Sequence, residues 1–355
     1  MQLLLPPDRE SATIRIVGQG LAGSALALSL IEHGYSVCVY DNDYRTSSSM
    51  IAAGMWNPLS FVNLKRAWLT HLLLPAMEET YPRFESLLQA SFYHPLPLLR
   101  IFPDAGAANT WEEKSIHPEV APYLDASTIS ESEVHFHQPH GHGVVKGAGW
   151  LDMPIFLNAT RTFLEKRNAY VQAEITVEHM KSWLHKGDWV VQCTGWKPMQ
   201  DSFWSAVPIH TNKGQVLTMR IDGLSEEYLS NFGKFTIPLG GSHFRVGSTY
   251  EHGALDMQPS EAANEIKEDV EKSVKHAFAV IDHKAGFRPT TIDRQPVLGV
   301  HDQYNRLAIF NGFGSRGVML VPFFAEQLIN YLTKGLPIMK EVDWQRFEKR
   351  RSRHH

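Results

Sequence analysis

Short apolar runs and one small-residue segment alternate over the N-terminal part of the chain. Strands are predicted at 13–17 and 36–40, with a glycine turn and an alanine- and leucine-rich helix at 24–33 between them. Gly34 stands where helices commonly end, because glycine takes the left-handed backbone conformation without steric cost. Strand, turn, helix and strand within about thirty residues predict a βαβ unit.

Helical and strand-like patterns of apolar residues continue along the rest of the chain. Helices are predicted at 67–88, 154–167, 260–277 and 318–332, and strands at 188–195, 215–219, 244–249 and 307–310. Pro75 and Pro82 are expected to interrupt the first of these helices, and Asp152 to open the second. The segment 91–145, with strand-like alternation at 134–138, predicts an antiparallel sheet. This order predicts an α/β fold with a Rossmann-like domain and a second α+β domain on a mixed or antiparallel sheet.

Composition excludes several classes of protein. The 355 residues are 43% hydrophobic with a formal net charge of −4, so no basic field indicates a nucleic-acid partner. Cys38 and Cys193 lie in apolar runs, which argues against a disulfide framework and favours a reducing compartment. Residues 1–10 lack a signal-peptide pattern, and no apolar run reaches about eighteen residues, so a cytoplasmic protein without a membrane span is expected. The basic segment 346–355 is predicted to be a solvated tail, with polyanion binding as the alternative.

The turn after the first strand reads Gly18-x-Gly20-x-x-Gly23. The first glycine allows a tight turn, the second lets backbone approach a pyrophosphate, and the third permits close packing of helix on strand. Asp41 follows at the end of the second strand, where a carboxylate accepts hydrogen bonds from ribose hydroxyls. The context therefore predicts dinucleotide binding, and a tight turn in an α/β domain without a ligand is the alternative.

Several segments resemble the FAD-dependent D-amino-acid oxidase / glycine oxidase superfamily. The stretch 47–55, Ser-Ser-Ser-Met-Ile-Ala-Ala-Gly-Met, resembles the family's segment along the flavin. Further similar segments follow in the family's order, at 149–152, 190–195, 214–217, 246–249, 285–299 and 311–318. The resemblance covers most of residues 13–332 and implies FAD as the cofactor, bound by a domain of the glutathione-reductase type.

The motif and the resemblance together give a set of expected cofactor contacts. They are Gly18, Gly20, Leu21, Ala22, Gly23, Asp41, Asn42, Ser48, Ser49, Met50, Ala53, Gly54, Met55, Thr194, Gly195, Trp196, Gly312, Phe313, Gly314, Ser315, Arg316, Gly317 and Val318. The expected FAD domain comprises 11–62, 146–205 and 283–340, and the substrate domain 63–145 and 206–282, with 341–355 as a C-terminal tail. A helix following the turn at 312–317 would point its positive end at a reduced flavin.

Three residues are candidates for substrate handling. The resemblance implies that Arg288, in Gly-x-Arg-Pro, anchors a substrate carboxylate; the alternative is a loop-fixing arginine. Tyr250 is expected to line the pocket or donate to the substrate, with packing in the core as the alternative, and Arg316 is expected to contact the flavin or the substrate. Arg245 falls near the position of a lysine close to the flavin in some relatives, but a solvent-facing strand arginine is expected.

Two features depart from a simple match. The stretch between Tyr170 and Gly195 is shorter than in relatives, so cofactor contacts are not carried over there, and Phe313 stands where a histidine is common.

The histidines at 135, 137, 140 and 142 suggest a metal site, but no Cys, Asp or Glu joins them at ligand spacing, so no metal is predicted.

The resemblance implies an FAD-dependent oxidoreductase that oxidises the C–N bond of a small amino acid or secondary amine by hydride transfer. The imine product would hydrolyse, and O2 or another acceptor would reoxidise the flavin. Two alternatives remain open. One is an enzyme similar to the FAD domain of bifunctional tRNA wobble-uridine modification enzymes, and the other is a flavin-binding protein without amine turnover.

Overall fold

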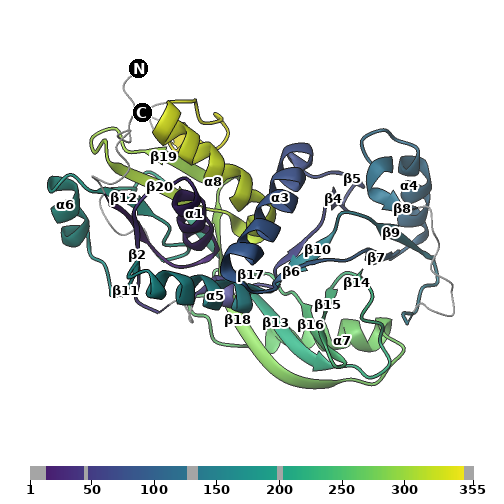
Figure 1. The fold of residues 1–355 in the computed structure, drawn as a ribbon. Coiled ribbons are helices and arrows are strands. Elements are labelled where there is room, and N and C mark those ends of the chain that lie inside the picture. Colours follow the sequence, from purple (N-terminus) through teal and green to yellow (C-terminus); the bar gives the residue numbers. More distant parts are fainter. Residues whose placement is uncertain (1–12, 44–46, 126–134, 198–202, 348–355) are drawn as a thin grey trace.

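The computed structural model describes residues 13–43, 47–125, 135–197 and 203–347. The expectations for residues 1–10, for Val134 and for 348–355 therefore lie outside the described residues. Figure 1 shows two lobes. One contains a six-stranded sheet with helices α1, α8 and α6, and the other contains a larger sheet with helices α7 and α4.

The six-stranded sheet is built around the predicted βαβ unit. Its order is β11 (Tyr170–Gln172), β2 (Val37–Asp41), β1 (Ile14–Val17), β12 (Trp189–Gln192), β20 (Leu307–Asn311) and β19 (Val297–Val300). The first five strands are parallel, and β19 runs antiparallel to β20. The carboxyl ends of β1, β2 and β12 therefore meet at one edge, where ligands of open α/β sheets bind.

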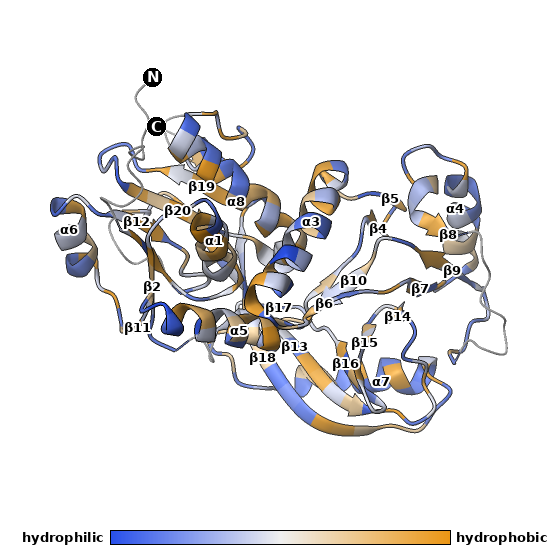
Figure 2. Cartoon of the chain, viewed as in Figure 1, coloured by the Kyte–Doolittle hydropathy of each residue, from blue (hydrophilic) through white to orange (hydrophobic). Residues whose placement is uncertain are grey.

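Both faces of this sheet are buried, because successive strand residues point to opposite sides. Ile16 belongs to the core under α1 (Leu21–Glu32), α5 (Met153–Lys166) and α8 (Gly317–Lys334). Val17 belongs to the opposite core, which α6 (Val177–His185) covers. In Figure 2 helix α1 is coloured hydrophobic over much of its length, as expected for a helix buried between a sheet and other helices.

Helix α3 (Thr70–Leu88) is continuous through Pro75 and Pro82, so the predicted interruption was wrong. Proline removes one backbone hydrogen bond from a helix, but tertiary packing compensates here. The helix packs against α8 and buries one apolar face, whose members include Met77, Tyr81 and Phe84. Asp152 opens α5 as predicted: its carboxylate accepts from the Ile155 N–H at 3.1 Å.

The larger sheet has nine strands. Its order is β17 (Glu251–His252), β13 (Ile209–Arg220), β16 (His243–Gly247), β15 (Phe235–Gly240), β14 (Leu229–Asn231), β7 (Leu98–Ile101), β9 (His142–Val145) and β8 (Leu124–Asp125), and β18 (Ala279–Thr291) pairs with β13. Helix α7 (Asn264–Ser273) packs on one face through Ile266 and Val270. The other face packs toward a three-stranded sheet of β3 (Met55–Trp56), β10 (Gly149–Leu151) and β6 (Tyr93–Pro95).

The remaining elements are short. They are α2 (Ser48–Ile51), the hairpin of β4 (Leu59–Ser60) and β5 (Lys65–Arg66), α4 (Ala105–Ser115), and 3-10 turns at Ala121–Tyr123, Glu261–Ala263 and Gly314–Arg316. Two expectations need correction here. Within 135–138 the structure has an isolated bridge between Phe136 and Val274 rather than a strand. Residues 283–291, expected in the cofactor domain, belong to β18 and pair with β13 in the larger sheet.

Residues 341–347, the described part of the expected C-terminal tail, pack on the fold, so the expectation of a solvated segment is wrong for Arg346 and Phe347. Trp344 is only 2% exposed, its indole packs edge-on against Trp204, and its Nε1–H donates to the Val300 carbonyl at 2.8 Å. Arg346 forms an ion pair with Asp293 at 2.9 Å. Trp344 and Phe347 form a short apolar segment that packs on the α6 side of the six-stranded sheet. Basic residues dominate the composition of the stretch 346–355, so the sequence did not indicate this packing.

Removing the Trp344 side chain tests whether the packing of residues 341–347 stabilises the fold. We expect Trp344→Ala to lower the free energy of unfolding by about 3–5 kcal/mol, because a large buried ring is replaced by a cavity. Ile116, which is exposed, supplies the control, since Ile116→Ala should change stability by less than about 0.5 kcal/mol. Urea unfolding measures both variants, and an unchanged Trp344→Ala midpoint would show that the segment is dispensable.

Candidate functional site

The turn after β1 requires glycine at two positions. Gly18 has φ +107°, and a Cβ there would lie 2.5 Å from the carbonyl oxygen of Cys193. A Cβ on Gly23 would lie 1.9 Å from the carbonyl oxygen of Gly18. No side chain fits at either distance, so these glycines let helix α1 begin directly against β1 and β12.

Asp41 ends β2 beside this turn. Its Oδ2 accepts from the Gln19 backbone N–H at 2.7 Å, while its Oδ1 is buried and has no hydrogen-bond partner among the described residues. Burial raises the pKa of Asp41, although the Gln19 N–H and the charge of Lys197 act in the opposite direction. A buried carboxylate oxygen without a donor is costly in a folded protein. The carboxylate is therefore suited to accept a hydrogen bond from a ligand hydroxyl.

The end of β12 lies next to Asp41 across β1. Gly195 has φ +63°, and a Cβ there would meet no atom within 4 Å, so its backbone borders open space. Asn311 donates from Nδ2 to the Gly195 carbonyl at 3.1 Å and holds this turn to the end of β20. Asn42 accepts from the Lys197 ammonium, and the Trp196 ring packs against Phe287 with centroids 5.0 Å apart. Thr194 lies in the same turn.

The N-termini of α1 and α8 lie side by side. A Cβ on Gly317 would approach Leu21 to 3.0 Å, which places the first turns of the two helices in contact. Neither helix has a side-chain cap or an acidic residue in its described first turn. Two positive helix ends thus meet, and neither has an acidic residue in its own first turn, which favours the binding of phosphate or other negative groups.

The loop at 47–55 runs between these helix ends and β18. The Ser49 hydroxyl accepts from the Leu21 N–H at 3.0 Å, and the Ser48 hydroxyl is buried without a partner in the described part of the chain. Gly54 has φ +77°, and a Cβ there would lie 2.0 Å from the Leu151 carbonyl oxygen. On the other side of the loop Ile51 comes within 3.3 Å of the Cβ position of Gly286 on β18. The expected contacts Met50, Ala53 and Met55 are partly buried along this loop.

The turn at 312–317 lies beside Thr290 and Thr291 at the end of β18. Gly312 has φ +76°, and a Cβ there would come within 2.9 Å of Thr291. Phe313 packs on Phe310 in the core with ring centroids 4.6 Å apart, and its backbone bridges to Thr290 of β18. Gly314 and Ser315 follow in the turn, and Val318, in the first turn of α8, accepts from the Tyr81 hydroxyl at 2.9 Å.

Arg288 lies on β18 next to this turn, and its guanidinium is held entirely by neutral acceptors. Nη1 donates to Asn212 Oδ1 at 3.0 Å, Nη2 donates to Ser248 Oγ at 2.8 Å, and both reach the Thr249 carbonyl at 3.2 Å. The ring of Tyr250, which is 64% exposed, covers the guanidinium at 4.3 Å. Burial lowers the pKa of Arg288.

Gly214 makes room for this side chain. A Cβ at Gly214 would lie 2.1 Å from Nη2 of Arg288. Because Arg288 pairs with Asn212 and Gly286 pairs with Gly214, these residues share the face of the sheet that points to the loop at 47–55.

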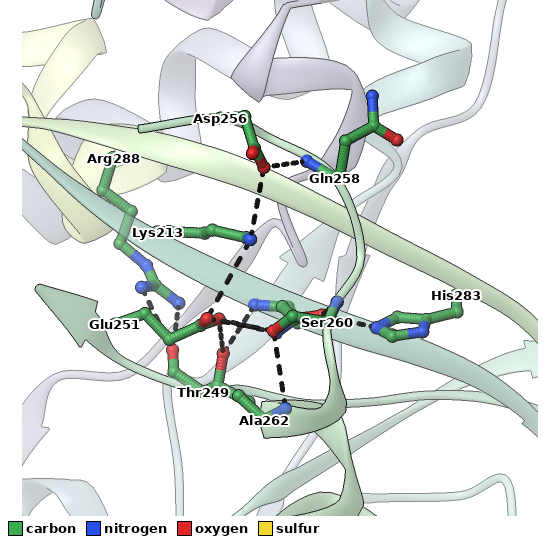
Figure 3. A network of polar contacts seen from close by, with 10 residues as sticks. Lys213, Thr249, Glu251, Asp256, Gln258, Ser260, Ala262, His283 and Arg288 are labelled. Atoms are coloured by element: carbon green, nitrogen blue, oxygen red, sulfur yellow. Dashed lines mark hydrogen bonds and ion pairs between the residues drawn. The ribbon is translucent and has the colours of Figure 1, made fainter. Parts of the chain in front are cut away.

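The opposite face of the same strands carries a polar network, seen close by in Figure 3. The Thr249 hydroxyl accepts from the Gln215 N–H at 2.9 Å, and Gln215 Nε2 donates to Glu251 at 2.6 Å and to Ser260 at 2.7 Å. Lys213, only 4% exposed, places Nζ 3.9 Å from Glu251. The network fixes Thr249, whose carbonyl accepts from Arg288. The sequence reasoning missed it, although polar residues at 213 and 215 in a buried strand were a detectable signal.

Arg245 contacts the loop at 47–55, and Arg316 lies in the 3-10 turn before α8. Arg316 donates no side-chain hydrogen bond to any residue that the structure describes, and burial lowers its pKa. Arg245 does not face solvent as expected: its Nη1 donates to the Ala52 carbonyl at 3.2 Å, and burial lowers its pKa, with Asp152 and Asp282 opposing. The correction follows from register, because Arg245 pairs with Thr218 and shares the face of Gly214 and Arg288.

The histidine-rich stretch forms no metal cluster within the described residues. His135 instead lies 2.9 Å from His276, ring nitrogen to ring nitrogen, and His142 contacts Gln138. Cys38 and Cys193 are both free thiols. Across the described ranges no helix is both long and apolar enough to cross a membrane.

Comparisons with known proteins agree with this geometry. The DAO family model, described as FAD dependent oxidoreductase, matches residues 13–331. The bifunctional protein MnmC of tRNA 5-methylaminomethyl-2-thiouridine biosynthesis from Thiobacillus denitrificans is 24% identical over 94% of this chain and 58% of its own length. Glycine oxidase from Pseudomonas putida is 26% identical over 38% of each chain. The chain thus spans less than two thirds of the curated relatives it matches first.

Solved structures show the same fold. Glycine oxidase from Bacillus cereus superimposes with a TM-score of 0.73 at 17% identity, covering 92% of this chain and 96% of that one. L-proline dehydrogenase from P. horikoshii gives a TM-score of 0.72 at 16% identity, covering 97% and 99%. The family match and the shared fold confirm the predicted fold class and FAD as the cofactor.

The residues of the site fit FAD. Asp41 offers a buried oxygen to a ribose hydroxyl, the paired helix ends at Leu21 and Gly317 favour a diphosphate, and Ser48 has an unused hydroxyl. Gly54 and Gly312 let backbone come close to a flat ring, as they have no side chain to displace it.

Asp41→Asn tests the ribose contact. This change keeps the shape of the side chain but removes the charge, so we expect FAD to bind about tenfold or more weakly. Titration of the apoprotein with FAD, followed by flavin fluorescence, measures the dissociation constant. Asp222→Asn, at an exposed aspartate, is the matched control, and equal dissociation constants for the two variants would refute the assignment.

Proposed function

The chain belongs to the DAO family of FAD-dependent oxidoreductases, and we propose that it oxidises the C–N bond of a small amine that carries a carboxylate. The observation that carries this proposal is Arg288. Its half-buried guanidinium stands beside the loop at 47–55 and has no acidic partner among the described residues. A positive charge that neutral groups hold in place is suited to receive a substrate carboxylate.

FAD, when bound, accepts the hydride that leaves the carbon beside the amine nitrogen. The protein's part is to hold that carbon in place. Asn212, Ser248 and the Thr249 carbonyl fix the guanidinium of Arg288, and Tyr250 covers it from the solvent side. A carboxylate held there has a defined direction, and this orientation supplies much of the rate in a reaction that needs little acid–base chemistry.

The products follow from the loss of hydride. The nitrogen lone pair forms the C=N bond, the amine proton passes to water, and water adds to the imine to give a carbonyl compound and a released amine. Glycine oxidase and proline dehydrogenase, by their names, act on amino acids, which supports a substrate of this size. The electron acceptor of the second half-reaction is proposed to be O2 or another oxidant.

A second candidate function is favoured by one comparison. The match to the tRNA modification protein covers 94% of this chain, whereas the match to glycine oxidase from Pseudomonas putida covers 38%. The substrate amine would then be part of a tRNA nucleoside. The formal net charge of −4 argues against a large RNA-binding surface. Salt-dependent retention of tRNA in a gel-shift assay, with oxidation of a tRNA-borne amine, would favour this alternative.

An absorbance spectrum and anaerobic mixing test the proposal directly. We expect purified protein to show flavin bands near about 370 and 450 nm. Within a panel of glycine, sarcosine, D-amino acids and L-amino acids, at least one compound should bleach the band at the longer wavelength. Bands that no amine bleaches would refute amine oxidation for this panel while leaving FAD binding intact.

Gly214→Ala tests the role of Arg288 without removing it. The added methyl group would collide with the guanidinium, which is the end of a flexible side chain and therefore moves away. We expect FAD binding to persist and KM for the amine substrate to rise about tenfold or more, with a smaller change in kcat. Arg288→Met should give the same pattern.

Gly106→Ala is the matched control for this glycine replacement, since Gly106 lies in α4, away from β13 and β18. Its KM should equal that of the unaltered protein. An unchanged KM in both Gly214→Ala and Arg288→Met would show that Arg288 only supports the strand.

A further inference from the structure

The loop at 292–296, here called the β18–β19 loop, is flanked by two residues that both pack on Gly312. A Cβ on Gly312 would lie 2.9 Å from Cγ2 of Thr291, the last residue of β18. It would lie 3.4 Å from Cγ1 of Val297, the first residue of β19. The conformation of the β18–β19 loop therefore bears directly on the turn at 312–317, which is expected to contact the flavin.

Arg346 holds this loop with its guanidinium. Nε and Nη2 donate to the two carboxylate oxygens of Asp293 at 2.9 and 3.2 Å. Nη2 also donates to the Gln295 carbonyl at 3.1 Å and to the Pro296 carbonyl at 2.9 Å. The rigid fork of donors on a guanidinium is suited to such a set of acceptors. One side chain thus ties together three residues of the β18–β19 loop.

Asp293 passes this support on to Thr291. Its Oδ1 accepts from the Thr291 hydroxyl at 3.0 Å and from the Gln295 N–H at 3.3 Å. Burial acts to raise the pKa of Asp293, but the hydrogen bonds and charge of Arg346 outweigh it and lower the pKa below its ordinary value. The carboxylate is therefore charged at neutral pH, and printed contacts lead from Arg346 through Asp293 and Thr291 to Gly312.

The segment 341–347 brings Arg346 to this place. The Leu298 N–H donates to the Val342 carbonyl at 2.8 Å, and the Trp344 N–H donates to the Leu298 carbonyl at 2.9 Å. The segment thus pairs with β19 in parallel, immediately beside the β18–β19 loop. The DAO family model ends at residue 331, so this support comes from a part of the chain beyond the family match.

We infer that Arg346 and Asp293 are positioning residues for FAD. They hold the β18–β19 loop in the conformation that sets the turn at 312–317 against the cofactor, and they act through Thr291 and Val297 rather than by contact with FAD. This inference rests on the cofactor site proposed above, and it gives the segment 341–347 a role in cofactor binding in addition to its packing.

Arg346→Met tests the inference. This change removes every hydrogen bond from the guanidinium to the β18–β19 loop, so we expect FAD to bind about tenfold or more weakly. Titration of the apoprotein with FAD, followed by flavin fluorescence, measures the dissociation constant. Arg346→Lys restores the charge beside Asp293 but not the fork of donors, so its dissociation constant should lie between those of Arg346→Met and the unaltered protein.

Thr291→Val interrupts the same chain of contacts at its other end. Valine keeps the methyl group that faces Gly312 but removes the hydroxyl that donates to Asp293. We expect it to weaken FAD binding as well. Combined with Arg346→Lys, it should weaken binding by less than the product of the two separate effects, because both changes act through Asp293. These two milder variants decide the question if Arg346→Met does not fold.

Arg83→Met is the matched control for loss of an ion-paired arginine, because Arg83 pairs with Glu32 at 3.0 Å between α3 and α1. It should leave the dissociation constant of FAD unchanged. An Arg346→Met protein that unfolds at lower urea but binds FAD as tightly as the unaltered protein would overturn the inference, because the segment would then serve stability alone. Effects of Thr291→Val and Arg346→Lys that simply multiply would overturn it too.

The titration with FAD contains no amine, which separates this inference from the proposed function. Unchanged FAD affinity in Arg346→Met, together with bleaching of the unaltered holoenzyme by an amine, would overturn the positioning role alone. Weaker FAD binding in Arg346→Met, together with a holoenzyme that no amine reduces, would support the positioning role and overturn the proposed oxidation.

Discussion

Close backbone contact at a few glycines is the constraint on which the site depends. At Gly18, Gly23 and Gly54 a Cβ would fall between 1.9 and 2.5 Å from a carbonyl oxygen, which belongs to Cys193, to Gly18 of the same turn and to Leu151, respectively. These contacts press the start of α1 against β12 and the loop at 47–55 against β10. Only then can the ends of α1 and α8 meet and leave their unpaired N–H groups facing one region. The surface that we propose for the cofactor is thus mostly backbone, and side chains such as Asp41 and Ser48 would complete it.

Features of the fold and of the site could be predicted from the sequence where the residues that determine them lie close together in the chain. The glycine turn, Asp41 and the cap at Asp152 act within a few residues or within one βαβ unit, so their sequence context is sufficient to identify them. The orientation of Arg245 depends on the register of three strands, and the burial of Trp344 depends on a sheet face formed by distant segments. Neither is encoded locally, which is why Arg245 was expected to face solvent and why the packing of Trp344 was not predicted.

The long pair β13 and β18 joins the cofactor site to the larger sheet. On one face of the pair Gly214 leaves space for Arg288, and on the other Gln215 organises Glu251, Ser260 and His283. Alternation along one strand therefore supplies both the space for Arg288, the proposed anchor, and the structure that holds it. The sequence indicated the anchor through the Gly-x-Arg-Pro resemblance, but not its support, because the partners of Gln215 lie 34 to 68 residues further along the chain.

The choice of neutral acceptors around Arg288 has a functional consequence. An aspartate at Asn212 would hold the guanidinium equally well, but it would neutralise the charge and repel an incoming carboxylate. An amide, a hydroxyl and a carbonyl fix the same geometry and leave the charge available to a ligand. Under the proposed function, the buried charge is stabilised less in the absence of substrate, and this deficit would become binding energy when the carboxylate arrives. The guanidinium of Arg288 can therefore be both rigidly positioned and uncompensated in charge. Hydrogen bonds to neutral groups fix its position, and the lack of an acidic partner leaves its charge available.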